Sequence, residues 1–276
     1  MTSVYGAMHS ELAQALRLLA RLSYILGDPA EAVAQQHRAA LMSERCNGVD
    51  HAYTIIEYIN LAHFAFSNLY IPAALRLLYR ARYLLLIAHG ENHPLMAQID
   101  GNIGVILFAV HEFDAALRFL QSAEAAMAAN GEPKRLKSAL VQHIAARAHA
   151  SRGDFRAALA AEKETYSIYN GLFGPEHEKT KESSEYLSQL TMQAVAFQRK
   201  VMDATKGNNV GPLLPTQALY STYHAVSVAF LAHIYRSSSS LWQVRDKAVG
   251  FDQSRHAGYA THPTSSEHRR GFECVQ

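Results

Sequence analysis

Cysteine is scarce in this sequence of 276 residues, where only Cys46 and Cys274 occur. They lie far apart and form no Cys-x-x-Cys pair, which excludes the disulfide framework of small secreted domains and a paired-cysteine metal site. We therefore expect a reduced, intracellular setting. Glycine and proline are also sparse through residues 1–200, and no segment there alternates polar and apolar residues as strands do. The absence of both signals argues against a β-fold.

Long hydrophobic runs are missing as well, although 49% of the residues are apolar. No stretch of 18 or more apolar residues occurs, and the N-terminal segment lacks the basic flank and apolar centre of a signal peptide. The nearest approach to a membrane span, residues 218–235, is interrupted by Ser221, His224 and His233. We expect a soluble cytoplasmic protein that is not secreted and does not insert into a membrane.

Excess charge of either sign is absent from most of the chain. The formal net charge is +2, and residues 1–200 hold 19 Lys and Arg against 19 Asp and Glu, so the basic excess lies in the last 76 residues. A neutral body argues against the broad positive field of non-specific nucleic-acid binders. A local basic groove stays compatible with this balance.

Catalytic motifs are also lacking. The sequence contains no glycine-rich phosphate loop, HExxH or GxSxG. Carboxylate pairs such as Glu162 with Glu164, or Glu182 with Glu185, are interpreted as solvated helix faces. We expect no catalytic residues, no metal site and no cofactor, and hence a protein that is not an enzyme.

What the sequence does contain is an internal repeat with a period of 42 residues. Glycines recur at this step and each is followed three residues later by a histidine, except in the third repeat, where Glu132 and Arg135 stand instead. Small residues recur in three further series. The members are Gly6, Gly48, Gly90 and Gly174; His9, His51, His93 and His177; Ala20, Ala62, Gly104 and Ala146; Ala32, Ala74, Ala116 and Ala158; and Ala39, Ala81, Ala123 and Thr165.

Small residues at a fixed step indicate helices whose backbones cross closely. The spacings are those of tetratricopeptide repeats, which predicts an all-α, right-handed superhelical solenoid of four helix pairs. The first helices are expected near Glu11–Leu26, Tyr53–Ser67, Leu95–Val110 and Leu136–Arg152, and their partners near Pro29–Cys46, Pro72–His89, Phe113–Ala129 and Phe155–Gly171. A capping helix is expected from Glu178 to Met202, which completes a domain over residues 1–202.

The Gly-x-x-His segments are interpreted as linkers between pairs, where glycine ends one helix with a positive φ. The four histidines could also form a metal array, since histidine is the commonest metal ligand. Successive repeats, however, place equivalent residues roughly 10 Å apart, too far to share one ion. A histidine that caps or packs the turn is therefore the preferred interpretation.

A solenoid of this kind offers a concave groove lined by the first helices. Counting from the small-residue series, the groove positions are partly cationic, which suits an acidic peptide, a carboxylate terminus or phosphates. The alternative is that these are ordinary solvated side chains. The candidate groove-binding residues are Arg17, Arg21, Asn60, His63, Asn102, His143 and Arg147.

Three strings go beyond the generic repeat: residues 5–28, residues 77–107 and GPEHEKTKESSEYL at residues 174–187. They resemble the tetratricopeptide region of the clustered mitochondria protein family. The resemblance implies a cytoplasmic protein concerned with mitochondrial distribution, with binding of mRNAs for mitochondrial proteins and with association with a translation initiation factor. It also implies a fragment, because family members are longer and carry a ubiquitin-like and a central domain.

Two functions stay open at this stage. One is a scaffold that holds a protein or peptide in the groove, and the other is an RNA-binding module that uses the groove arginines. A kinesin-light-chain-like adaptor for acidic or extended peptides is the alternative family, which lacks the KTKESSEYL string. The last residues, 203–276, are expected to be a divergent, largely disordered tail with one possible helix at 216–236. The sequence predicts no oligomeric state.

Overall fold

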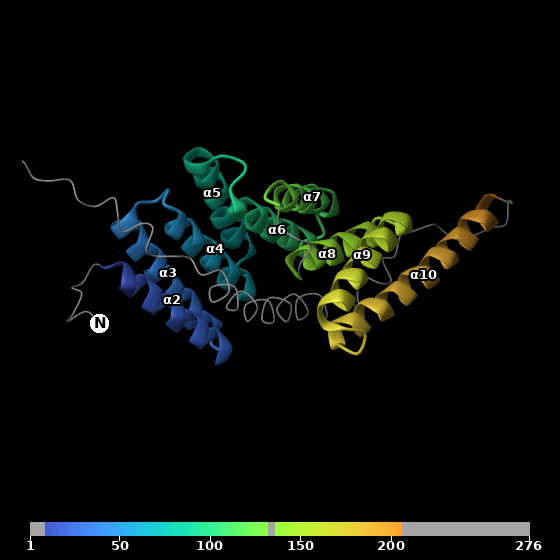
Figure 1. The fold of residues 1–276 in the computed structure, drawn as a ribbon, viewed down its shortest axis with the longest axis horizontal. Coiled ribbons are helices and arrows are strands. Elements are labelled where there is room, and N and C mark those ends of the chain that lie inside the picture. Colours follow the sequence, from blue (N-terminus) through green and yellow to red (C-terminus); the bar gives the residue numbers. More distant parts are fainter. Residues whose placement is uncertain (1–8, 132–135, 206–276) are drawn as a thin grey trace, which may run out of the picture. The chain divides into compact units, whose positions relative to one another are not determined.

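The computed structural model describes residues 9–131 and 136–205. Within these ranges every regular element is an α-helix. The helices follow one another as pairs joined by short turns, and Figure 1 shows the two helices of a pair, such as α2 and α3, side by side. Their bounds are α2 Ser10–Ile25, α3 Pro29–Asn47, α4 Ala52–Ser67, α5 Ile71–His89, α6 Pro94–Ala109, α7 Phe113–Ala129, α8 Leu136–Ser151, α9 Phe155–Phe173 and α10 Glu178–Thr205.

The predicted helix pairs are confirmed, with ends that differ from the expected ones by at most three residues. Consecutive helices joined by so few residues must run antiparallel and pack on each other. The first helices α2, α4, α6 and α8 each pack on their own partner and, after the first pair, on the second helix of the preceding pair. The chain is therefore a tetratricopeptide-type solenoid over the described residues.

The small-residue series lie where the helices cross. The three series that were predicted to mark the crossings are buried throughout: Ala20, Ala32, Ala39, Ala74, Ala81, Ala116, Ala123, Ala146, Ala158 and Thr165 are 0% exposed and Ala62 is 1% exposed, and Gly104 is buried too. A methyl group or a hydrogen at each crossing lets the two backbones approach, and larger side chains fill the space beside it. The repeat period is thus a packing constraint that recurs at each pair.

Each of these linkers contains a glycine that ends one helix and a histidine that begins the next. Gly48, Gly90 and Gly174 end α3, α5 and α9 with φ values of 94°, 81° and 83°, a region in which only glycine is unstrained. Three residues later a histidine caps the next helix through its Nδ1, which accepts the backbone N–H two residues further on. The distance is 3.2 Å at His9, His51, His93 and His177 alike.

The capping interpretation of the histidines is confirmed by these bonds. An imidazole that accepts at Nδ1 carries its proton on Nε2, so each cap needs the neutral ring. Among the described residues no group of three or more His, Cys, Asp or Glu side chains could hold a metal ion. Gly6, Glu132 and Arg135, which belong to the same series in the sequence, lie outside the described ranges.

Helix α10 covers the last pair, as expected of a capping helix. Its Leu190 is 0% exposed and packs with Phe155 and Ala158 of α9. The helix also stands in the 42-residue register of a first helix, since His177 caps it and Thr180 is buried like Thr54, three repeats earlier. It therefore occupies the place of a fifth first helix.

The C-terminal prediction is largely outside the described structure. Residues 203–205 belong to α10, which is three residues longer than expected. The expected tail after them and the possible helix at 216–236 lie outside the described residues. Within the described residues, none of the helices is both long enough and apolar enough to cross a membrane.

Two glycines in α6 test the packing constraint. A Cβ on Gly104 would lie 2.7 Å from Leu120 Cγ and 3.3 Å from the Ala116 carbonyl oxygen, whereas a Cβ on Gly101 would meet only Val141 and Ala123 at 3.7 Å and 3.9 Å. We expect Gly104→Ala to lower the free energy of unfolding by about 1–2 kcal/mol because the crossing is overpacked. Gly101→Ala, the matched control, should raise it by up to about 1 kcal/mol through helix propensity. Urea unfolding measures both, and stabilisation by both changes would contradict the constraint.

Candidate functional site

The candidate groove residues all come from first helices: two from α2, two from α4, one from α6 and two from α8. Six of them are half-buried, and Arg147 is buried at 8% exposure. We call the surface of the first helices that carries these seven residues the first-helix face. The contacts of each side chain show whether it already interacts within the fold.

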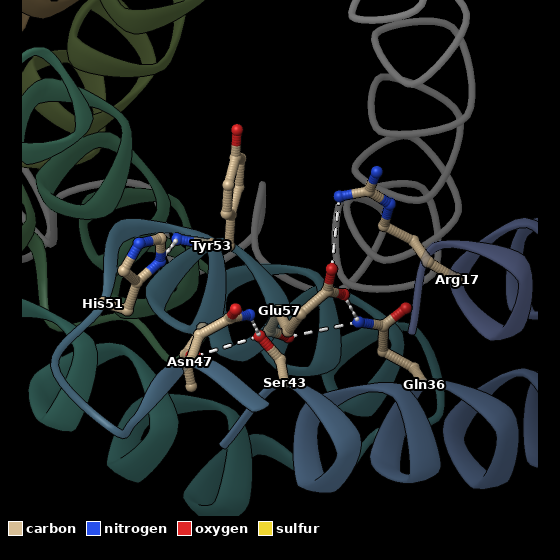
Figure 2. Close-up of polar contacts among 8 residues, drawn as sticks. Arg17, Gln36, Ser43, Asn47, His51, Tyr53 and Glu57 are labelled. Carbon is tan, nitrogen blue, oxygen red and sulfur yellow. Dashed lines mark hydrogen bonds and ion pairs between the residues drawn. The ribbon is translucent and has the colours of Figure 1, made fainter. Parts of the chain in front are cut away.

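Arg17 of α2 takes part in a polar cluster between the first two pairs. Its guanidinium donates to Glu57 Oε1 of α4 over 3.2 Å, and Gln36 of α3 donates its Nε2 to Glu57 Oε2 over 2.6 Å. Figure 2 shows the two side chains reaching the carboxylate from different helices. Glu57 is 3% exposed, and burial raises its pKa while the charge of Arg17 and the hydrogen bond from Gln36 lower it. Arg17 is therefore held by an internal counter-charge.

A second polar cluster ties the same two pairs together nearer to the linker between them. Ser43 of α3 and Thr54 of α4 share a 2.9 Å hydrogen bond, and the Thr54 hydroxyl donates to the Gly48 carbonyl over 2.7 Å. Asn47 donates to Ser43 over 3.1 Å, as Figure 2 shows. Both hydroxyl-bearing residues are buried. The bond to Gly48 connects this cluster to the linker whose histidine begins α4.

Two more buried carboxylates lie between helices further along the chain. Asp100 of α6 accepts from Arg82 of α5 and from Ser122 of α7, each over 2.7 Å. Glu162 of α9 lies 2.9 Å from Nδ1 of His143 and accepts from Ser183 of α10 over 2.5 Å. Both carboxylates are 0% exposed. The interpretation of Glu162 as part of a solvated helix face is wrong, because α10 packs over the side of α9 that carries it.

The 42-residue register relates two of these clusters. Gln36 and Glu57 are separated by 21 residues, as are Glu162 and Ser183, and the second pair lies 126 residues, or three periods, after the first. The two intervening interfaces carry Leu78 with Ile99 and Leu120 with Val141 at the same register, all buried. We call this pair of positions, one on a second helix and one on the first helix that follows, the register slot. The register slot is polar at the first and last interfaces of the array and apolar at the two interfaces between them.

His63 of α4 is enclosed by aromatic rings. Its ring lies 5.6 Å from that of Tyr24 and 5.3 Å from that of Phe64. Burial, aided by the positive charge of Arg21, lowers the pKa of His63 to about 4. The ring is consequently neutral at physiological pH and contributes polarity, not charge, to the first-helix face.

Arg147 and His143 of α8 face different partners. The Arg147 guanidinium carbon lies 5.5 Å from the centre of the Phe108 ring, in cation–π geometry. His143 contacts the Tyr186 ring edge-on at 5.6 Å as well as Glu162. These contacts extend from α8 to α6 in one case and to α9 and α10 in the other. The nearby amide of Asn60 of α4 helps to lower the pKa of Glu57.

The three residues His143, Glu162 and Ser183 are the types found in hydrolytic triads, but their order is different. The carboxylate stands between the histidine and the serine, so the hydroxyl donates to Glu162 and not to the imidazole, as it would in a triad. The arrangement holds three helices together through buried hydrogen bonds.

The sequence pattern singled out Arg17 and His143 but not the buried carboxylates that hold them, Glu57 and Glu162. A third buried carboxylate, Asp100, was missed as well. Glu57 and Asp100 stand in apolar stretches of α4 and α6, where a lone acid among aliphatic residues is a signal for a buried, partnered group. The 21-residue spacing between Gln36 and Glu57 is a second signal. It becomes visible only when the equivalent Leu78 and Ile99 are set beside it.

Comparison with known proteins places this geometry in a family context. Two family models, both described as Tetratricopeptide repeat, match residues 12–53 and residues 95–171. The chain is 63% identical over 228 residues to a clustered mitochondria protein homolog of Brugia malayi. It is 58% identical over 217 residues to the homolog of Caenorhabditis elegans and 52% identical over 214 residues to that of Homo sapiens.

These alignments cover 82%, 79% and 76% of this chain but only 16%, 17% and 16% of the relatives. The chain thus spans about a sixth of the length of the curated relatives that it matches. The shared part contains the helix pairs described above.

Solved structures share the fold at low identity. A protein described as a kinesin light chain of Podosopora anserina, with nearly identical TPR-like repeats, superposes with a TM-score of 0.59 at 19% identity and covers 72% of this chain and 92% of its own. BtubC of P. vanneervenii gives a TM-score of 0.56 at 15% identity over 96% of this chain and 89% of its own. At these identities the likeness concerns the fold alone.

The register slot makes a test of the buried carboxylate possible. Replacing Gln36 and Glu57 by Leu and Ile reproduces the Leu78 and Ile99 pair of the next interface. We expect Gln36→Leu with Glu57→Ile to be neutral or stabilising by about 1–3 kcal/mol, because buried ion pairs seldom exceed a well-packed apolar pair. Arg17→Met alone should cost roughly 3 kcal/mol, since it leaves Glu57 charged and buried. If urea unfolding showed the double variant to be less stable than Arg17→Met, the slot would not accept the apolar pair in place of the polar one.

Acidification should weaken the fold. His63 and His93 have lowered pKa values, His93 through burial and the charge of His89, so the unfolded chain binds protons more readily near pH 6.5. Their contribution is complete above pH 6.5 and declines as the pH falls below it. We expect the free energy of unfolding to drop by about 1 kcal/mol between pH 7.5 and 5.5 through His63, and further in the same direction through His93.

Two variants isolate this effect. His63→Phe removes the titrating ring from its aromatic surroundings, and His93→Ser keeps a capping oxygen that does not titrate. Each should flatten the pH dependence measured by urea unfolding. An unchanged slope in both variants would assign the pH dependence to other groups.

Proposed function

Since the chain belongs to the clustered mitochondria protein family, with which it shares its helical repeats, we propose that it is a non-catalytic scaffold that binds a protein or peptide ligand on the first-helix face. Tetratricopeptide solenoids present their first helices as a continuous surface for such ligands. The clusters on this face supply hydrogen-bond donors and charge, and none of them pairs a nucleophile with a base. Packing and recognition are the chemistry that they support.

A single observation carries the proposal: one register position of the first helices is cationic or imidazole-bearing in three of the four pairs. Arg21, His63 and Arg147 stand one residue after the small residues Ala20, Ala62 and Ala146. The third pair has Val105 at this place. Core positions of the same helices carry aliphatic residues, so a series with two arginines and a polar imidazole suits an anionic ligand.

Ligand chemistry follows from these side chains. An acidic segment, or a peptide that ends in a carboxylate, would accept from the guanidinium of Arg21. His63 is neutral and supplies a polar ring edge beside it. Arg17 is engaged with Glu57 at 3.2 Å, so a ligand that uses Arg17 must compete with that ion pair. A contact with Arg21 leaves the Arg17–Glu57 ion pair intact, and Arg21 is therefore the residue on which we expect recognition to depend most.

The finer role comes from the family. We propose that the scaffold serves mitochondrial distribution in the cytoplasm, together with the binding of mRNAs for mitochondrial proteins and association with a translation initiation factor. What supports this is the name of the relatives and the resemblance of residues 174–187. Because the chain spans about a sixth of those relatives, it would contribute one part of that role.

Direct RNA contact by the first-helix face is the second candidate. The observation that favours it is the presence of Arg21 and Arg147 on the same register. Against it stands the 8% exposure of Arg147, whose guanidinium lies on the Phe108 ring. A peptide needs fewer exposed cations than a phosphate chain does, and it is the ligand that we prefer.

An affinity purification from cell lysate, with and without ribonuclease, tests the proposal. The bait is the whole chain, its Arg21→Ser variant, or the control Arg156→Ser, which removes the same charge from an exposed position on α9. We expect bound proteins to survive ribonuclease and to weaken about tenfold with Arg21→Ser, because a charge-assisted contact contributes about 1.5–3 kcal/mol. The control should bind like the unchanged chain.

Circular dichroism melting confirms first that both variants fold. If ribonuclease removes the bound proteins, the RNA candidate replaces the peptide proposal, and a titration with single-stranded RNA at two salt concentrations then measures it. Equal loss in both variants would mean that general charge, and not the first-helix face, attracts the partners.

A further inference from the structure

Helix α5 has an unusual composition for a solvated second helix. Its 19 residues include three arginines and no aspartate or glutamate. Arg82 is occupied internally, since it donates to Asp100 of α6 over 2.7 Å. Arg76 and Arg80 point outward with three large side chains, Tyr79, Tyr83 and Ile87, which are 44%, 63% and 66% exposed.

These five residues form one stripe, which we call the α5 face. Tyr79, Tyr83 and Ile87 follow each other at steps of four residues, so they lie on one side of the helix over about 12 Å. Arg76 precedes Tyr79 by three residues and Arg80 lies beside it. Two positive charges thus flank one end of an aromatic and aliphatic strip.

The stripe lies away from the core side of α5. The buried residues of α5 are Ala74, Leu78, Ala81 and Leu85, on the opposite side of the helix. At the register of Tyr79, Tyr83 and Ile87, the other second helices carry side chains that are mostly small or polar. These are His37, Leu41 and Arg45 in α3, Gln121, Ala125 and Ala129 in α7, and Lys163, Ser167 and Gly171 in α9. The stripe is therefore a local feature of α5 and not a property of the repeat.

Neighbouring helices hold one end of the stripe in place. The Tyr79 ring meets Phe119 of α7 edge-on at 6.0 Å. The Arg80 guanidinium lies 5.0 Å from the centre of the Tyr58 ring and 4.0 Å from Glu44. Tyr83 and Ile87, one and two turns further on, are the most exposed. Rigid tyrosine and arginine side chains beside exposed apolar ones are the composition of binding hot spots.

We propose that the α5 face docks an acidic amphipathic helix of a partner protein. Charge complementarity predicts an acidic partner, because α5 carries arginines and no acidic residue. The four-residue spacing predicts that the partner segment is a helix. Its own i, i+4 side chains would lie along Tyr79, Tyr83 and Ile87, and its carboxylates would meet Arg76 and Arg80. This surface lies on a second helix and is separate from the first-helix face.

A protein suits this face better than RNA or a membrane. Only two arginines point outward, and one already contacts Glu44 and Tyr58, so the field for phosphates is small. Membrane attachment draws on a longer apolar strip with many basic residues beside it. Three large apolar side chains next to two guanidinium groups match the size of a protein contact.

A displayed library of random 18-residue peptides, selected on the purified whole chain, tests the proposal. We expect the enriched peptides to carry net negative charge with aliphatic residues three or four apart. Fluorescence anisotropy then compares four proteins: the unchanged chain, Tyr83→Ser with Ile87→Ser, Arg76→Gln with Arg80→Gln, and the control Gln121→Ser with Ala125→Ser on α7. Both α5 variants should lose at least tenfold in affinity, and the control should not.

Three further arms make the test decisive. Arg21→Ser should leave these peptides bound, which separates failure of the α5 face from failure of the first-helix face. Poly(U) and vesicles of phosphatidylcholine with phosphatidylserine are titrated in parallel. Enriched peptides without negative charge, peptides that ignore the α5 variants, or α5 variants that instead weaken poly(U) or vesicle binding would each overturn the proposal. Circular dichroism checks the fold, and the high exposure of Tyr83 and Ile87 keeps their replacement away from the core.

Discussion

Close approach of helix backbones at small residues is the constraint on which the structure depends. Ala20, Ala62, Gly104 and Ala146 are buried where each first helix crosses the second helix of its pair, and even a methyl group at Gly104 would lie 2.7 Å from Leu120 Cγ. The crossing sets how the two helices lie, and the 42-residue step repeats it. All the remaining positions of a pair then meet equivalent neighbours in each repeat. A residue that departs from the common pattern therefore has a local cause.

The helices and their caps could be predicted from the sequence because their signals are local or periodic. The small-residue series located the crossings, and the Gly-x-x-His segments located the ends to within three residues. The buried carboxylates could not be recognised in this way. Glu162 stands among charged neighbours and looks solvated in isolation, and only the packing of α10 shows that Ser183 and His143 enclose it. The candidate groove residues lie on the first helices, but which of them the fold engages depends in part on the buried carboxylates Glu57 and Glu162.

The slot between successive pairs is polar only at the ends of the array, although a separate buried cluster around Asp100 lies in its middle. In the middle, Leu78 with Ile99 and Leu120 with Val141 fill it with aliphatic side chains, which pack without needing partners. At the ends, Gln36 with Glu57 and Glu162 with Ser183 need partners, and each pair obtains one from a first helix: Arg17 in the first case and His143 in the second. A polar slot needs a neighbouring helix that carries a matching hydrogen-bond partner, whereas an aliphatic slot does not.

The proposed binding of a ligand on the first-helix face would be coupled to packing. Glu57 reaches Arg17 from the slot between the first and second pairs, so the guanidinium that holds this interface is also one of the candidate ligand contacts. A ligand carboxylate that captured Arg17 would leave Glu57 buried with the amide of Gln36 as its remaining close donor, which raises the free energy of that interface. The charge of Arg21, one turn further along α2, favours the ionised form of Glu57 and the neutral form of His63. Binding through Arg21 keeps the ion pair intact, and this difference is why the two arginines of α2, although four residues apart on one helix, are expected to contribute unequally to recognition.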